Sequence, residues 1–299
     1  AILRVYPEPN WTGLGGNYYS IRGVPQYLTD HTGRVDWRAS DRWHLYTRLL
    51  HSRQNVTTPY GQTGNLIPLF DLTQARFGNN FMLAVNHTLD ARTTHQLQAG
   101  YADFRDRLNL PGGGPARDRF GFESIGEYFP GNRLNRIPNV TIAGYQPVSG
   151  SGHPTFAAAP TFTLRDQVSR LAGAHSLKAG FYFERPGINQ LNAANDNGSF
   201  SFVASAANPR NPRNALAGAL LGYFDQYVES TEPVQTPYRS RIFEYFVQDA
   251  WRARRNLSLE FGVRYSWLPP WWSAWSLPSQ PAGSSVRCTT RTRSPGRPL

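Results

Sequence analysis

Residues 256–267 read NLSLEFGVRYSW, and this stretch decides the fold. Every second position in it is apolar: Leu257, Leu259, Phe261, Val263, Tyr265 and Trp267. The positions between them are polar or glycine, so the period is two, as in a strand whose successive side chains point to opposite faces. An amphipathic helix would instead repeat its apolar positions at intervals of three and four. The stretch therefore predicts a β-strand that is apolar on one face and polar on the other.

A second strand is expected just before it, over residues 239–251. Phe243, Tyr245, Val247 and Trp251 fall on one face of this segment, and Asp249 interrupts that face near its end. The link between the two segments is short and polar, since it reads RARR over residues 252–255. Two alternating segments joined in this way predict a β-hairpin.

The same unit recurs three times earlier in the chain. The predicted strand pairs are 33–39 with 43–50, 77–89 with 93–104, and 161–171 with 176–184. Long connections rich in glycine, proline and asparagine lie between the hairpins, over residues 51–76, 105–160 and 185–238. Such loops are unusual in a compact soluble domain, whereas short turns at one end and long loops at the other are typical of outer-membrane barrels. Weaker strands are expected near Phe200 and Tyr223, and a short helix is expected over 214–221.

The composition favours a membrane barrel over a soluble domain. Charged residues make up 17% of the 299 residues, against about 25% in a typical soluble protein. The net charge of +11 comes from arginines that are scattered along the chain, with no basic helix or stripe, so no nucleic-acid partner is expected. The single cysteine, Cys288, excludes a disulfide framework and a cysteine-based zinc site. No apolar stretch is long enough for a transmembrane helix, but a barrel strand of about 9–11 alternating residues crosses a bilayer.

Two sets of residues are candidates for functional positions in such a barrel. Aromatic side chains form girdles where lipid meets water, and the girdle candidates are Trp37, Trp43 and Trp251 beside the short turns, with Tyr265 and Trp267 at the far end of their strand. The lumen-facing candidates are Lys178, Tyr182, Glu184, Glu260 and Arg264, which occupy the polar positions of alternating strands. We expect these polar residues mainly to solvate the lumen, with contact to a substrate as the alternative.

No motif for catalysis or for a cofactor is present. The chain lacks G-x-S-x-G, H-E-x-x-H and the phosphate-binding loops, so we expect neither an enzyme nor a bound cofactor or metal. His87 and His95 flank one turn and could face each other across a hairpin. A metal site needs further ligands and supporting contacts, so histidines at the membrane interface or in the lumen are the favoured interpretation.

Four segments taken in order resemble the barrel of TonB-dependent receptors. They are HSLKAGFYFER (175–185), NGSFSF (197–202), NALAGALLGYFDQYVES (214–230) and EYFVQDAWRARRNLSLEFGVRYSWLPP (244–270). The closest resemblance is to the Oar-like group, whose members usually begin with a carboxypeptidase-regulatory-like domain. The stretch TGRVDWRASDRWHLYTRLL (32–50) resembles an earlier hairpin of the same barrel, so the resemblance covers roughly residues 30–272.

The resemblance implies a 22-stranded barrel in the outer membrane of a Gram-negative bacterium. It also implies a plug, a segment that contacts TonB, and uptake of a bulky substrate with energy from the inner membrane. The implied partners are outer-membrane lipid, the TonB complex through the plug region, and an unknown transported substrate. This chain shows neither a plug nor a closing strand, so we expect an all-β antiparallel meander that forms part of such a barrel over residues 1–272. Residues 273–299, with four arginines and no acidic residue, are expected to be a disordered or frame-shifted tail.

Two other functions remain open at the level of the sequence. A passive porin-like barrel would share the alternation and the turns. A secreted, soluble β-sandwich that binds carbohydrate would use the aromatic residues as its core, and it would be soluble without detergent.

Overall fold

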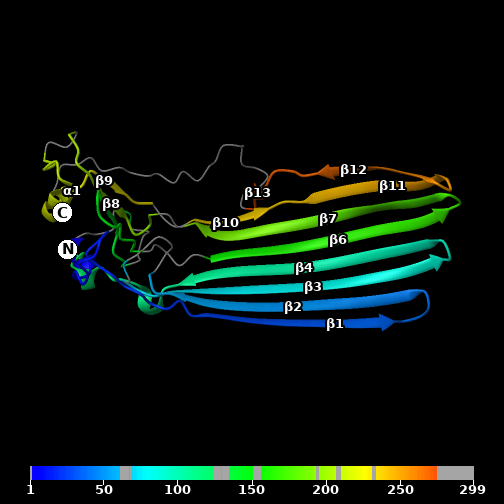
Figure 1. Cartoon of the computed structure of the whole chain (residues 1–299), viewed down its shortest axis with the longest axis horizontal. Helices are drawn as coiled ribbons and strands as arrows, with labels where there is room; N and C mark the ends of the chain where they lie inside the picture. The colour runs from blue at the N-terminus through cyan, green and yellow to red at the C-terminus, as the bar shows by residue number, and fades with distance from the viewer. Residues whose placement is uncertain are drawn as a thin grey trace.

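The computed structural model describes residues 2–60, 67, 69–123, 129, 135–150, 156–192, 195–206, 210–230 and 234–274. Ten strands form one antiparallel sheet, and three short strands form a second sheet. The long strands lie side by side in a single layer, with short turns at one end and a small folded unit at the other (Figure 1). The ten strands of the large sheet are β1 (Gln26–Arg38), β2 (Trp43–Thr58), β3 (Leu72–Asp90), β4 (Thr93–Asn109), β6 (Phe156–Ala172), β7 (His175–Asn192), β10 (Val234–Arg239), β11 (Ile242–Arg254), β12 (Leu257–Trp267) and β13 (Trp272–Ser273).

The large sheet is the predicted meander of hairpins. Its long strands pair in the order β1-β2-β3-β4-β6-β7-β11-β12, and every pairing is antiparallel. All four predicted hairpins are confirmed as β1–β2, β3–β4, β6–β7 and β11–β12. The sheet is open among the described residues, because β1 and β12 each pair on one side only.

Two short strands, β10 and β13, lengthen the last two lines of strand and do not make the sheet wider. Strand β7 pairs with β11 over its first half and with β10 over its second half, so β10 and β11 form one line interrupted at Ser240 and Arg241. Strand β13 pairs with β10 after Pro269 and Pro270, which cannot donate a backbone hydrogen bond. The wall therefore consists of eight lines of strand.

The strands extend further toward the long loops than the sequence predicts. Strand β3 has 19 residues and β7 has 18, whereas about 9–11 residues cross a bilayer. The predicted limits of loops 51–76, 105–160 and 185–238 were therefore wrong, because each loop is shorter than expected. The prediction failed because these extensions lack a period-two signal: residues 53–55 of β2 are polar on both faces, and residues 156–160 of β6, which read FAAAP, do not alternate with polar residues.

Three of the four short turns are tied to the strand that follows in the sheet. The backbone N–H of Thr88 donates to the carbonyl of Arg42 at 2.8 Å, and the N–H of Leu171 donates to the carbonyl of Arg92 at 2.8 Å. The N–H of Arg252 donates in the same way to Ala174, also at 2.8 Å. Because this bond repeats from hairpin to hairpin, the short turns form a continuous rim.

The small folded unit contains the two weaker strands expected near Phe200 and Tyr223. They are β8 (Ser199–Phe202) and β9 (Gln226–Val228), which form the second sheet with β5 (Asn139–Ile142). Their assignment to the barrel wall was wrong, because strands of three or four residues are too short to cross a membrane. Short 3-10 helices are η1 (Ile2–Val5), η2 (Pro111–Gly113) and η3 (Asp118–Phe120).

The predicted short helix is confirmed as α1 (Ala215–Leu221) in the same unit. The side chain of Asn214 accepts a hydrogen bond from the N–H of Ala217, and Gly222 ends the helix in the left-handed conformation at φ 76°. No helix among the described residues is long and apolar enough to span a bilayer.

Candidate functional site

One face of the large sheet is apolar and exposed. The register places Val247 of β11 opposite Val263 of β12 and Ala179 of β7, so their side chains share a face. On this face Val263 is 74% exposed and Phe261 is 57% exposed. The 11 residues of β12, at about 3.3 Å each and a tilt of about 40°, give a band about 28 Å tall, close to the height of about 25 Å of the apolar band of an outer-membrane barrel. A soluble β-sandwich would cover this face with a second sheet, and that interpretation is wrong for the wall that the structure describes.

All five girdle candidates lie on the apolar face. Trp37, Trp43 and Trp251 lie at the end with the short turns, and Tyr265 and Trp267 lie toward the opposite end of β12. The structure adds three rings that the sequence analysis missed. Ring centroids of Phe162 and Phe183 are 6.3 Å apart, those of Phe183 and Phe243 are 4.8 Å apart, and those of Phe243 and Trp267 are 5.7 Å apart. The row of candidate girdle rings at the long-loop side thus runs across four strands, which only the pairing register reveals.

The opposite face is polar, and all five lumen-facing candidates lie on it. Tyr182 donates a hydrogen bond to Glu184 at 2.7 Å, and Arg264 forms an ion pair with Glu244 at 3.3 Å. Lys178 and Glu260 lie apart from these pairs, because Lys178 is opposite Gln248 and Glu260 is opposite Ala250. The candidates are therefore spread over the wall and do not form one cluster.

Side chains on neighbouring strands link into a ladder on this polar face. Gln96 donates to Asn86 at 2.9 Å, and Gln167 donates to Gln96 at 2.9 Å. Arg165 donates to Gln167 at 3.0 Å, so the ladder crosses β3, β4 and β6. The sequence analysis did not single out these residues, since glutamine and asparagine at alternating positions have no distinctive motif. In a barrel this face lines the lumen.

Two carboxylates interrupt the apolar face, and each is paired with a histidine on the next strand. His95 of β4 lies 2.7 Å from Asp166 of β6, and His175 of β7 lies 2.6 Å from Asp249 of β11. Carboxylates that face lipid are costly unless they are paired. The side chain of Asp249 is only 11% exposed, because the neighbouring side chains cover it.

The two histidines of the β3–β4 hairpin do face each other, as the sequence allowed. His87 is directly opposite His95 in the register. However, His87 stacks on Trp43 with ring centroids 3.7 Å apart, while His95 bonds Asp166. No group of three or more metal-ligating side chains occurs in the described part of the chain.

We expect His175 and Asp249 to stabilise the wall together, so that removing His175 alone costs more stability than removing both. His175→Phe keeps an aromatic ring beside Trp251 but leaves the carboxylate of Asp249 facing lipid without its partner. The expected loss is about 1.5–3 kcal/mol of unfolding free energy, as for a lost hydrogen bond to a charged group. Adding Asp249→Leu to this variant should restore most of the stability. Unfolding by denaturant from lipid bilayers measures both variants; if the double variant is no more stable than His175→Phe, the two residues do not act as a pair.

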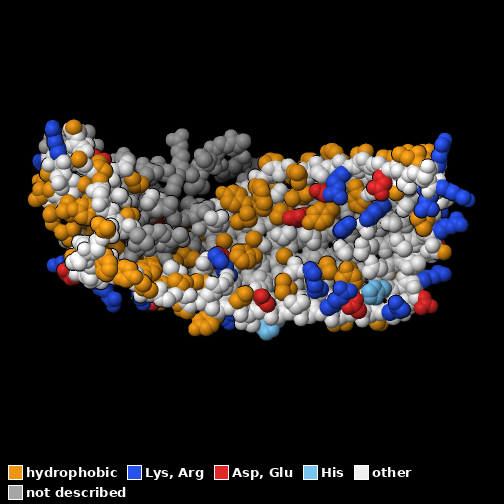
Figure 2. All heavy atoms as spheres, viewed as in Figure 1, with side chains coloured by type: hydrophobic (Ala, Val, Ile, Leu, Met, Phe, Trp, Pro, Cys, Tyr) orange, Lys and Arg blue, Asp and Glu red, His pale blue; other side chains and the backbone are white. Residues whose placement is uncertain are grey.

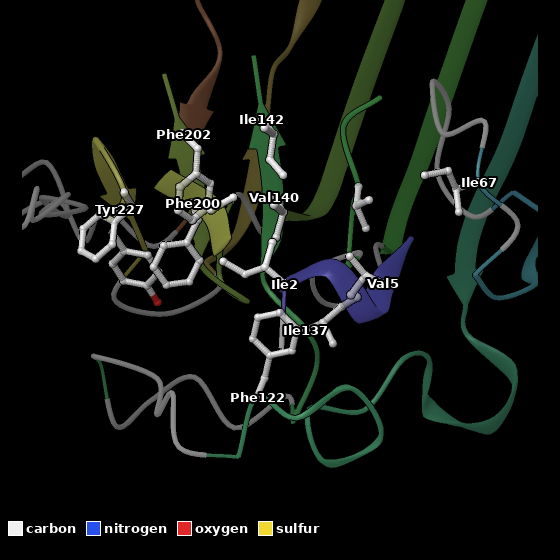
Figure 3. Packing of buried hydrophobic residues seen from close by; sticks show 13 residues of the cluster. Ile2, Val5, Ile67, Phe122, Ile137, Val140, Ile142, Phe200, Phe202 and Tyr227 are labelled. Carbon is white, nitrogen blue, oxygen red and sulfur yellow. The ribbon is translucent and has the colours of Figure 1, made fainter. Parts of the chain in front are cut away.

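The unit at the long-loop end, here called the cap, has its own hydrophobic core (Figure 3). The cap consists of the described residues of 2–6, 110–150 and 195–230, with Ile67. Its core is built from segments far apart in sequence: Ile2, Val5, Ile67, Phe122, Ile137, Val140, Ile142, Val148, Phe200, Phe202, Ala219, Phe224 and Tyr227. Phe122 and Phe202 are almost completely buried. The loops of three hairpin connections therefore fold together into one packed unit.

Polar contacts also hold the cap segments together. Asn197 donates from Nδ2 to the carbonyl of Ile137 at 2.9 Å, and Arg117 donates to the carbonyl of Asn197 at 3.1 Å. Tyr6 donates to the carbonyl of Gln146 at 2.9 Å, and burial raises the pKa of this tyrosine. These contacts join the first residues of the chain to the loop between β4 and β6.

The comparisons with known proteins agree with this geometry. A family model described as an outer membrane beta barrel domain matches residues 1–278. No curated protein and no solved structure matches the chain. The matched region includes all of the described strands, and the family places the protein in the outer membrane. The chain belongs to the outer-membrane β-barrel family, and its large sheet is part of a barrel wall.

Proposed function

We propose that this wall belongs to a TonB-dependent receptor that takes up a bulky substrate. The observation that carries the proposal is the order of the segments resembling that family. In the structure they are β7, the cap strand β8, the cap segment from α1 to β9, and the hairpin β11–β12. The resemblance thus covers both the wall and the cap in one consistent order, whereas alternating hairpins alone occur in many barrels.

The cap supports a receptor more than a passive pore. Strands of 16 to 19 residues rise beyond the membrane band in β2, β3, β4, β6 and β7, and a packed unit lies at their long-loop end (Figure 1). In barrels of this kind the long loops face the cell exterior. A preorganised surface unit gives a large substrate a defined contact area. A pore for small solutes needs no such unit.

The polar face is suited to line a lumen with polar contents. It would contact them through hydrogen bonds as well as through charge. It carries amides, tyrosines and both signs of charge, as in the Gln96–Gln167 contact and the Arg264–Glu244 pair. In the proposed receptor this face surrounds the plug, and the protein is a transporter with no catalytic role. The polar side chains act as positioning groups there, and the identity of the substrate depends on the cap and the plug.

The experiment that tests this proposal uses the protein purified from its native outer membrane. In planar bilayers a plugged receptor should show almost no steady conductance, and in cells it should form a site-specific crosslink with TonB. A large, stable conductance without a TonB crosslink would instead establish the passive porin.

A further inference from the structure

The short-turn rim carries a concentration of positive charge. We define this rim as residues 38–43, 90–93, 170–175 and 252–257, which form the four short turns and the strand ends beside them. Its acidic residues are Asp41 and Asp90, and its basic residues are Arg38, Arg42, Arg92, Arg170, Arg252, Arg254 and Arg255. Figure 2 shows Lys and Arg side chains gathering at this end of the sheet. All seven arginines are exposed.

None of these seven guanidinium groups forms an ion pair in the part of the chain that the structure describes. The arginine ion pairs found there are made by residues elsewhere: Arg22, Arg34, Arg76, Arg105 and Arg264. The two rim carboxylates offset only part of the charge of seven arginines. Asp90 interacts electrostatically with Arg170, and it also accepts a hydrogen bond from the backbone N–H of Arg92 at 2.7 Å, which shapes the turn. The positive charge of the rim is therefore available to a partner.

The tryptophans define the height of the rim relative to the membrane. Each girdle tryptophan at this end is adjacent in sequence to a rim arginine, as in Trp37–Arg38, Arg42–Trp43 and Trp251–Arg252. Tryptophan rings lie at the level of the headgroups, so the rim lies at or just beyond that level. Short turns of these barrels face the periplasm, so the adjacent headgroups are those of the inner leaflet.

The rim is also held rigidly. The carbonyls of Arg42, Arg92 and Ala174 accept backbone hydrogen bonds from the next strand and so fix three of the four turns, and Arg170 projects from the apolar face of β6, on the same side as His175. Arginine offers several N–H donors that match phosphate oxygens. A rigid row of such groups at headgroup height is suited to binding phosphate-bearing lipids.

We propose that the short-turn rim binds the headgroups of anionic phospholipids in the inner leaflet of the outer membrane. This inference rests on membership of the barrel family and holds for a receptor or a porin. Cell-wall polymer is the other polyanion near this surface, but the girdle places the rim against lipid. Arg170 and Arg254 share the apolar face with Leu177 and Leu257, and Arg42 and Arg92 lie in the turns, whereas Arg38 and Arg252 project from the polar face. The first four are therefore the sites proposed to contact lipid.

The test measures which lipid surrounds the protein in bilayers of defined composition. Purified protein is placed in phosphatidylcholine bilayers that contain brominated phosphatidylglycerol or, for comparison, brominated phosphatidylcholine, and quenching of tryptophan fluorescence gives the relative affinity. The native protein should prefer phosphatidylglycerol. Arg→Gln at Arg42, Arg92, Arg170 and Arg254 together should lower this preference at least about tenfold at low salt. High salt should weaken the preference of the native protein.

Two control variants separate this site from general charge and from misfolding. Arg→Lys at the same four positions keeps the charge and should keep most of the preference. Arg→Gln at Arg4 and Arg119, exposed arginines of the cap, should leave it unchanged. Excess inorganic phosphate at constant ionic strength should not displace the lipid, because a free ion lacks the attachment to the bilayer. A native protein without the preference, or a four-glutamine variant that retains it, would overturn the proposal.

Discussion

Replacing Val247 by arginine is expected to lower the unfolding free energy of the membrane-inserted protein by about 2–4 kcal/mol, the cost of a cation near the bilayer midplane. Val247 lies midway along the apolar face of β11, between Trp251 and Phe243, and its cross-strand neighbours are Val263 and Ala179. No carboxylate lies directly opposite it, and the nearest one along the same face, Asp249, already bonds His175.

The matched control is Ala250→Arg, three residues along the same strand. Ala250 lies on the polar face opposite Glu260, so the same substitution there should change the stability by less than about 1 kcal/mol. Denaturant titration in lipid bilayers compares the two variants. Equal losses would show that the two faces of the sheet do not differ in environment, contrary to a barrel wall.

Replacing Phe202 by alanine is expected to remove about 3–5 kcal/mol from the stability of the cap, as for a large aromatic residue in a packed core. The side chain is 1% exposed, and its ring lies 6.3 Å from that of Phe200 in the same cluster. Because the residue lies in β8, outside the large sheet, the loss should be confined to the cap.

Hydrogen exchange locates the effect. Amides of β5 and β8 should lose protection, and trypsin should cut faster at cap arginines such as Arg119, while the amides of β3 and β4 should keep their protection. Leu220→Ala is the control, since that side chain is 60% exposed on α1 and should have little effect. If β3 and β4 lost protection together with the cap, the cap and the wall would form a single cooperative unit.

The sequence predicts the wall well because its signal is local. Residues such as Phe261 and Val263 alternate with polar residues wherever one face meets lipid, so all four hairpins and the positions of the short turns follow from a period of two. The signal ends where the strands leave the membrane, and the extensions of β2 and β3 were therefore assigned to loops. Family resemblance, and not periodicity, suggests the receptor.

The cap could not be predicted from the sequence, because its core depends on contacts between distant segments. Phe122 and Phe202 are separated by a complete hairpin, and the short alternation around Phe202 does not reveal that the two residues share a core. The His–Asp pairs escape prediction for a related reason. Asp249 is visible in the sequence as an interruption of an apolar face, but its partner His175 is identified only by the register between β7 and β11.

The residues that meet in the cap also determine when it can fold. Each wall hairpin joins neighbours in sequence and closes a short loop, so it can form as soon as its two strands are present. The contact between Tyr6 and Gln146, by contrast, closes a chain segment that contains two complete hairpins. We therefore expect the cap to form late in assembly, after the strands around it have reached their places in the wall. A chain that stalled before β7 would hold the first two wall hairpins, β1–β2 and β3–β4, but would have an unfinished surface, because β8, α1 and β9 would be absent from it.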